Sequence, residues 1–250
     1  MKAPRIIVWL LVMNLLLSCT AFSAGAEDEF PKVGEYITFG TYEQDNNLEN
    51  GPESIEWQVL KVEDGRAMVL SRYVLELKAY HHIIAVDSSV SWETWDIRAW
   101  LNKEFFEGSF DEEEIARIPT VIVETPVLHH FANVPPINDT EDKVFLLSYQ
   151  EASRYLKGGK ARKCQPTEYA IANYETIQGK EWNRKMSVRE ADYGNCLWWL
   201  RSSGEFPGSA MMVGSDGGIN GYIGYLNLTN LDMQDYNYGI RPAMWIDLTP

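Results

Sequence analysis

The segment NCLWWLRSSG, residues Asn195–Gly204, is the most informative part of this chain, because it sets a cysteine, two adjacent tryptophans and an arginine within six residues. In a β-strand, neighbouring side chains point to opposite faces, so Trp198 and Trp199 cannot both enter one side of a core. Arg201 shares the side of Trp199, and a partly buried guanidinium needs a carboxylate or carbonyl partner. The segment therefore predicts an interior strand in which these side chains hold the fold together.

The last third of the chain predicts more core strands. Arg241 faces the same need for a partner as Arg201, and Asp96 is one of several candidates. Connections rich in Gly, Asn and Tyr separate the expected strands, which are CLWWLRS (Cys196–Ser202), SAMMVGS (Ser209–Ser215) and GIRPAMWIDL (Gly239–Leu248). We therefore expect structural roles for Trp198, Trp199, Arg201 and Arg241.

Strands also begin the folded part of the chain. VGEYITFGTY (Val33–Tyr42) alternates and is rich in aromatic and branched residues, which is typical of a strand. IEWQVLKVEDGRAMVLS (Ile55–Ser71) predicts two strands that meet at Asp64-Gly65, since Asp-Gly is a strong signal for a tight hairpin turn.

Helices are expected in the middle of the chain. TWDIRAWLNKEFF (Thr94–Phe106) places apolar residues at helical spacing and predicts an amphipathic helix. Capping boxes predict two further helix starts, at Asp111 with Glu114 and at Ser148 with Glu151.

The helix after Ser148 is expected to stop at Gly158-Gly159, and a short helix is expected near Thr167. The order is strands, then three or so helices, then strands with long C-terminal loops. No linker or internal repeat interrupts it, so residues 33–250 indicate one α+β domain with mixed or antiparallel sheets.

The first 26 residues are typical of a secretory signal peptide, followed by a short linker at residues 27–32. Lys2 and Arg5 give a basic start, and IIVWLLVMNLLL (Ile6–Leu17) is a twelve-residue apolar run. That run is too short to span a bilayer, which needs about 20 residues.

Two routes of processing are open. Cleavage after the small residues of Ala24–Ala26 would release Glu27 as the new N-terminus. Alternatively, LLSC resembles a lipoprotein box, in which Cys19 would carry a lipid. Either route predicts a protein outside the cytoplasm, with membrane attachment only through the lipid.

The chain is strongly acidic, with a formal net charge of −14. Removal of residues 1–26 takes away two positive charges and no negative one, so the charge of the remainder becomes −16. We expect no nucleic-acid partner, because phosphate contacts need clustered Lys and Arg side chains.

Two cysteines follow the signal region, Cys164 and Cys196. In an oxidising compartment an isolated pair predicts a disulfide, which would contribute roughly 3–4 kcal/mol in the chain-entropy description. The alternative is a pair of buried free thiols.

No residue stands out as catalytic or metal-binding. The four histidines form the pairs His81-His82 and His129-His130, which lack the i, i+4 spacing of a helical metal site. Asn138–Asp142 and Ser215–Gly218 offer oxygen atoms without the ligand order of a calcium loop, and they are read as polar turns. A G-x-S-x-G nucleophile motif is absent, and we expect no cofactor.

In chain order, FGTYEQ, IEWQVL, WETWDIRAWLN, VFLLSYQEA, NCLWWLRSSG and YGIRPAMWIDL resemble a family of secreted bacterial domains of unknown function. The resemblance implies a C-type-lectin-like architecture, similar to that of sulfatase-modifying factors. Those enzymes would use two nearby cysteines, whereas Cys196 has no close neighbour in sequence. The chain departs from the family at Glu43 and Ser203, where proline is common, and Glu175–Ala191 looks like an insertion.

In such an architecture the C-terminal loops present a ligand surface. Gly214–Gly239 mixes flat aromatic rings with amides, and Tyr and Asn on Gly-rich loops give large contact areas at low entropy cost. The expected ligand-binding residues are Asp216, Asn220, Tyr222, Tyr225 and Tyr236. The alternative is a set of tight turns whose tyrosines cover the sheet edge.

We therefore expect an extracytoplasmic, non-enzymatic binding or adhesion module for a glycan, a peptide or another cell-envelope component. The main alternative is an enzyme that acts on envelope polysaccharide or protein through ionisable groups brought together by the fold. A third is a structural component of a surface assembly, which would expose a flat apolar patch.

Overall fold

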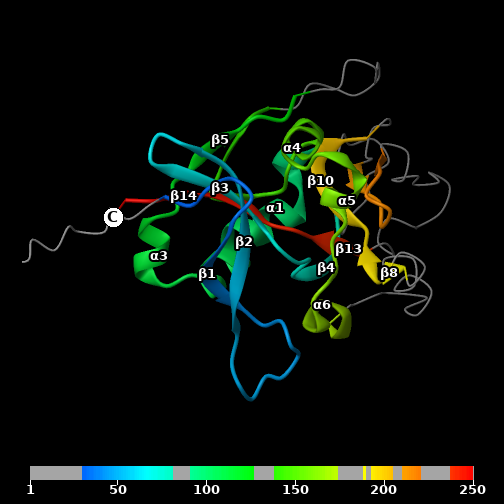
Figure 1. Ribbon diagram of the computed structural model, residues 1–250, viewed down its shortest axis with the longest axis horizontal. Helices are drawn as coiled ribbons and strands as arrows, with labels where there is room; N and C mark the ends of the chain where they lie inside the picture. The colour runs from blue at the N-terminus through cyan, green and yellow to red at the C-terminus, as the bar shows by residue number, and fades with distance from the viewer. Residues whose placement is uncertain are drawn as a thin grey trace, which may run out of the picture. The chain divides into compact units, whose positions relative to one another are not determined.

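The computed structural model describes residues 30–80, 91–126, 138–173, 188–189, 193–204, 210–220 and 237–249 (Figure 1). This part of the chain is mixed α/β, with mostly antiparallel sheets and short helices. Residues Pro31–Pro250 form one compact unit. Among the described residues no helix is long and apolar enough to cross a membrane. The signal peptide and the lipidation site at Cys19 lie outside the described residues and stay predictions.

The first sheet contains the N-terminal strands and has the order β1-β2-β3-β14-β7. All of its pairings are antiparallel. The predicted hairpin is confirmed, because Asp64 and Gly65 both have positive φ angles, 48° and 73°, between β2 and β3. Its strands are β1 (Tyr36–Tyr42), β2 (Glu53–Glu63), β3 (Arg66–Ser71), β14 (Ala243–Asp247) and β7 (Val144–Phe145).

The second sheet contains the tryptophan segment and has the order β12-β11-β10-β13-β4. One pairing is parallel, that of β10 with β13, where Trp198 lies opposite Gly239. The other pairings are antiparallel. Its strands are β4 (Glu76–Ala79), β10 (Trp198–Ser203), β11 (Ala210–Val213), β12 (Ile219–Asn220) and β13 (Asn237–Ile240).

The segment GIRPAMWIDL differs from its prediction as a single strand. It divides at Arg241-Pro242, so that β13 belongs to the second sheet and β14 to the first. Pro242 has no N–H to donate to a ladder, which favours a break at this point. The red segment in Figure 1 shows the chain crossing from one sheet to the other. The C-terminal strands thereby join the two sheets.

The helices are short. The predicted helix after Thr94 forms as three consecutive pieces, α1, the π-helical η2 and α2, and both predicted capping boxes are present. The helical segments are η1 (Trp92–Thr94), α1 (Asp96–Trp100), η2 (Leu101–Phe105), α2 (Phe106–Ser109), α3 (Glu112–Ala116), α4 (Tyr149–Tyr155), α5 (Gly158–Arg162) and α6 (Glu168–Ala172).

One helix boundary is corrected. The expected stop at Gly158-Gly159 is the start of α5, and α4 already ends at Tyr155. Gly158 has a φ of +78°, which reverses the chain between the two helices. Thr167 caps α6 as expected, through a hydrogen bond that its hydroxyl accepts from the N–H of Ala170.

Two small two-stranded sheets complete the described fold. They consist of β5 (Val121–Val123) with β6 (Thr140–Asp142), and of β8 (Val188–Arg189) with β9 (Asn195–Cys196). The largest fully buried side chains are tryptophans, namely Trp57, Trp92, Trp95 and Trp198. The aromatic content of the sequence is therefore used in good part to fill the interior.

Candidate ligand-binding site

The two adjacent tryptophans of β10 pack on opposite sides of their strand. Trp198 is fully buried, donates from Nε1 to the carbonyl of Arg162 at 3.0 Å, and has the Arg241 guanidinium 5.2 Å from its ring. Trp199 donates from Nε1 to the carbonyl of Lys78 at 3.2 Å. Alternation along the strand thus sends one ring towards α5 and the other towards β4.

Trp199 belongs to an aromatic group around the end of β4. Its ring centroid lies 4.6 Å from that of Tyr80 and 4.7 Å from that of Tyr238, and all three side chains are buried. Trp95 contacts Tyr80 in the same group, and the Tyr80 hydroxyl and the Trp95 Nε1 have no hydrogen-bond partner among the described residues. This group is an interior cluster at the sheet edge, since none of its rings is open to solvent.

Arg201 lies in the interior with several partners. Its guanidinium donates to the carbonyls of Leu146 and Glu124, at 2.6 Å and 2.8 Å for the closest pairs, and forms an ion pair with Glu151. The ring of Phe145 lies 5.5 Å from the guanidinium carbon. The arginine therefore connects β10 to the first turn of α4, to the residue after β7 and to the residue after β5.

Arg241 is buried with a different set of contacts. Its Nε donates to the carbonyl of Ser71 at 2.8 Å, while its Nη1 has no partner in the part of the chain that the structure describes. Asp96, one candidate partner from the sequence, is not paired with it within the described ranges. Arg98, which lies two residues after Asp96, is paired with Asp142, whose Oδ1 accepts from Arg98 Nε at 2.7 Å.

Sequence reasoning missed the carboxylates that serve these arginines. Glu151 was identified only as a helix-capping residue, and its side chain does accept the Ser148 N–H at 2.7 Å. The same Glu151 oxygen also accepts from Arg201, 50 residues further along the chain. A signal for this second role was not present, because nothing in the sequence brings the start of α4 beside β10.

Of the expected ligand-binding residues, Asp216 is the one whose side chain the structure describes. It is exposed in the turn between β11 and β12, where its Oδ1 accepts the N–H of Gly218 at 2.8 Å. Asn220 ends β12, but its side chain is not described. Tyr222, Tyr225 and Tyr236 lie outside the described residues. The structure therefore neither brings these five side chains together nor separates them.

The turn that carries Asp216 is held tightly against α5. Arg162 Nε donates to the Gly217 carbonyl at 2.7 Å, and the Gly214 N–H donates to the Gly218 carbonyl at 2.7 Å. Gly217 has a φ of +83°, and a Cβ atom built on it would lie 1.9 Å from the Gly159 oxygen. The two backbones can approach so closely because Gly217 carries no side chain.

Both ends of residues 221–236 are attached to the second sheet. Before this segment, Met212 and Val213 of β11 pair with Asn220 and Ile219 of β12. After it, β13 pairs on one side with β4, where Asn237 lies opposite Ala79, and on the other with β10. A sixteen-residue connection with three of the expected tyrosines thus starts and ends on a hydrogen-bonded frame.

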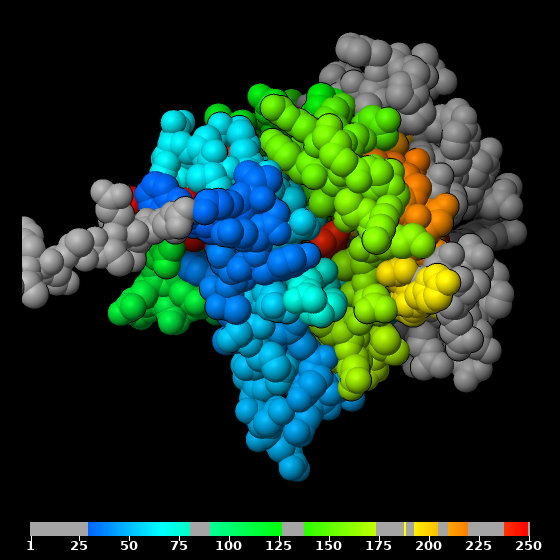
Figure 2. All heavy atoms as spheres, in the orientation of Figure 1, coloured from blue at the N-terminus to red at the C-terminus, as the bar shows by residue number. Residues whose placement is uncertain are grey.

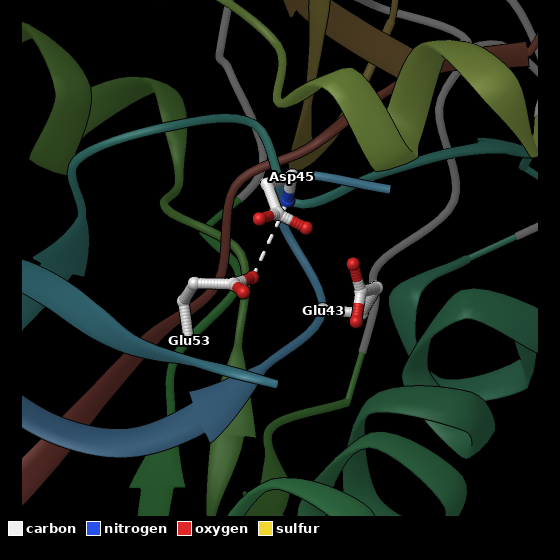
Figure 3. A group of neighbouring side chains, drawn as sticks. All are labelled: Glu43, Asp45 and Glu53. Atoms are coloured by element: carbon white, nitrogen blue, oxygen red, sulfur yellow. Dashed lines mark hydrogen bonds between the residues drawn. The ribbon is translucent and has the colours of Figure 1, made fainter. Parts of the chain in front are cut away.

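A group of three carboxylates lies where β1 is joined to β2, with Glu43 and Asp45 in the connecting loop and Glu53 as the first residue of β2 (Figure 3). Oxygen atoms of Glu43, Asp45 and Glu53 lie within 4.8 Å of one another, close enough to share a cation. All three also accept hydrogen bonds from this loop, including 2.7 Å from the Gln44 N–H to Glu53 and 2.8 Å from the Asn47 N–H to Asp45. Closing the loop is therefore a sufficient role for them.

The surroundings of Glu43 and Asp45 shift the pKa values of these two carboxyls in opposite directions. Slight desolvation and the nearby Glu53 raise the pKa of Glu43, whereas hydrogen bonds from Asn50 and Asn47 lower the pKa of Asp45. Beside this loop, Tyr42 is half-buried and donates to Glu76 at 3.0 Å. Burial, followed by the Glu76 charge, raises the pKa of Tyr42 far above its usual range. The phenol stays protonated and acts as a donor.

The two cysteines are buried neighbours with free thiols. The Cys196 N–H donates to the Cys164 carbonyl at 2.7 Å. Disulfides need Cα atoms about 4.4–6.8 Å apart, and this hydrogen bond makes the two residues backbone neighbours. The predicted bridge is not formed in the structure, but the two residues lie side by side, and the pairing stays a prediction.

We expect the secreted protein, unfolded without reductant, to leave both Cys164 and Cys196 unlabelled by an alkylating reagent. Burial raises the pKa of the Cys164 thiol, and burial followed by the nearby Cys164 raises that of Cys196. Burial and a raised pKa both disfavour the reactive thiolate in the folded protein, so the labelling is carried out after unfolding. Mass spectrometry of the labelled protein measures this, and two labels per chain would contradict the bridge.

The model of a domain of unknown function, DUF6273, matches residues 64–248 of the chain. The match begins at the β2–β3 turn and extends to the end of β14, so it includes the second sheet and strands β3, β14 and β7 of the first sheet, but not β1 or β2. Searches of curated proteins and of solved structures found no match.

Proposed function

The chain belongs to the DUF6273 family of domains of unknown function, and we propose that it is an extracytoplasmic binding module without catalytic activity. In this proposal the fold is C-type-lectin-like and the ligand is a glycan, a peptide or another component of the cell envelope. The ligand surface is the C-terminal segment Gly214–Gly239, supported by the second sheet.

The observation that carries the proposal is how the tryptophan–arginine segment is used. The side-chain N–H groups of Trp198, Trp199 and Arg201 donate to carbonyls and to Glu151 inside the protein. Buried arginines paired in this way have structural roles more often than catalytic ones. The residue combination that looked most like a site is thus committed to the interior.

The C-terminal segment, by contrast, is anchored to the scaffold at both ends. Its first turn is locked to α5 by the Gly217–Gly159 contact, and its end enters the sheet as β13. Between these anchors lie Tyr222, Tyr225 and Tyr236 among Gly and Asn residues. A rigid scaffold with aromatic and amide side chains on its connections is the usual design of a binding surface.

A glycan and peptidoglycan-fragment array tests the proposal. We expect the secreted chain to bind at least one class of ligand, and Tyr222→Ala with Tyr225→Ala to weaken binding by at least about tenfold, as for aromatic anchors of other interfaces. Tyr193→Ala is the matched control, because Tyr193 is 83% exposed and lies in the β8–β9 connection. It is expected to bind like the wild type.

Two results would contradict the proposal. One is cleavage or chemical conversion of a bound array component, which would favour the enzymatic alternative. The other is unchanged binding by the double variant, which would move the ligand surface away from the C-terminal segment. Circular dichroism of both variants checks that the fold is retained.

A further inference from the structure

One segment of this acidic protein has a local excess of positive charge. Residues 152–167 contain no Asp or Glu, yet they include five cations, whereas the whole chain has 22 Lys and Arg against 36 Asp and Glu. The five are Arg154, Lys157, Lys160, Arg162 and Lys163. In a chain of net charge −14 a random stretch is expected to be acidic, whereas this stretch is basic.

Three of these cations form a lysine row along α5. Lys157 is the N-cap residue of the helix, Lys160 lies in its last turn and Lys163 is its C-cap residue. The three lysines thus follow one another at intervals of three residues along α5 and its two caps. Lys157 and Lys160 are exposed, and Lys163 is half-buried.

No ion pair neutralises the lysine row within the described part of the chain. The other two cations of the segment are used differently. Arg154 is exposed with its guanidinium 5.6 Å from the Tyr155 ring, and Arg162 donates to the carbonyls of Leu156 and Gly217. Asp216, on the adjoining turn, directs an oxygen to the Gly218 N–H. The lysine row therefore carries a local positive charge that attracts anions.

The lysine row adjoins the proposed ligand surface. Gly159 of α5 contacts Gly217, and the Arg162 side chain bonds to the same turn. In Figure 2 the yellow-green surface of this segment lies directly beside the orange surface of β11 and β12, where Gly214–Gly239 begins. A ligand that binds the C-terminal segment next to this turn would also reach the lysines.

We propose that the ligand of this module is an anionic glycan, a polysaccharide with carboxylate or phosphodiester groups, and that the lysine row binds its charges. This inference rests on the proposed function and narrows it to one chemical class. Duplex nucleic acid carries one charge per about 1.7 Å of its axis and needs many cations over a long path. A short row on a protein of net charge −14 suits a polymer with sparser charge.

Binding of labelled polygalacturonate fragments tests the inference, with dextran of equal length as the neutral probe. We expect polygalacturonate to bind more tightly than dextran and to lose affinity as the salt concentration rises to about 0.3 M, where the screening length is short. The triple variant K157Q/K160Q/K163Q is expected to weaken polygalacturonate binding by at least about tenfold. Dextran binding should not change.

The matched control is K32Q/K61Q/K103Q, which also changes the formal net charge from −14 to −17 but lies away from α5. It should bind polygalacturonate within about twofold of the wild type, because long-range charge alone is screened. Equal losses in both triple variants would overturn the role of the lysine row.

Two further arms separate this inference from the proposed function. Equal binding of dextran and polygalacturonate, both lost in the Tyr222→Ala/Tyr225→Ala variant, would leave the binding module in place and overturn its anionic specificity. Lysine-dependent binding to duplex DNA or to anionic lipid vesicles, with none to polygalacturonate, would overturn the glycan assignment. Absence of binding to every probe and to the array would overturn both.

Discussion

Arg201→Met is expected to lower the free energy of unfolding by about 3–5 kcal/mol, the range found when one partner of a buried ion pair is removed. The Arg201 side chain is 3% exposed, while that of Glu151 is 25% exposed. The substitution leaves Glu151 without its cation and leaves the carbonyls of Leu146 and Glu124 without their donor. The buried carbonyl of Leu146 is then left desolvated without a hydrogen bond, and the partly buried Glu151 keeps a charge without its cation.

Urea denaturation followed by tryptophan fluorescence measures this loss. Arg66→Met is the matched control, because Arg66 also pairs with a carboxylate, Asp247, but its side chain is 46% exposed. Exposed pairs contribute about 0–1 kcal/mol, so the control should change stability little. A loss below about 1 kcal/mol in Arg201→Met would contradict the interior role of this arginine.

Gly217→Ala is the second substitution with a large expected effect, a loss of at least about 3 kcal/mol or local unfolding of the β11–β12 turn. The added Cβ would lie 1.9 Å from the Gly159 oxygen and 2.6 Å from its carbonyl carbon. Backbone atoms cannot move aside as the end of a flexible side chain can. The turn must therefore separate from α5 and give up the Arg162 hydrogen bond.

Comparison with Gly65→Ala separates the steric part of that loss from the conformational part. Gly65 has a φ of +73°, similar to the +83° of Gly217, but no atom lies within 4 Å of the position of its Cβ. It should therefore show only the conformational cost of about 1–2 kcal/mol. Equal losses at both positions would show that the Gly159 contact does not constrain the turn. Ligand binding by Gly217→Ala should also weaken, because the C-terminal segment begins at this turn.

Local features of the fold followed directly from the residues. The Asp64-Gly65 hairpin and the capping boxes of α3 and α4 involve groups within a few positions of each other, so neighbouring residues are enough to specify them. Helix boundaries were less certain. The glycine pair expected to end α4 instead opens α5, because a glycine with positive φ can also reverse the chain at the start of a helix.

The candidate site could be predicted only in part. The tyrosines of the C-terminal segment were identified from their composition, and their side chains lie outside the described residues. The lysine row was not identified, although the absence of acids from residues 152–167 is visible in the sequence. A basic stretch becomes informative once α5 is known to pack against the turn that carries Asp216.

The sequence alone was sufficient for the alternation of Trp198 and Trp199, since the geometry of a strand sends successive side chains to opposite faces. Only the tertiary structure decided the partners of these side chains and of the arginines near them. Glu151 meets Arg201 from 50 positions away, and Ser71 meets Arg241 from 170 positions away. Such contacts depend on how the two sheets are connected through β13 and β14, and residue spacing along the chain carries no information about distances across that junction.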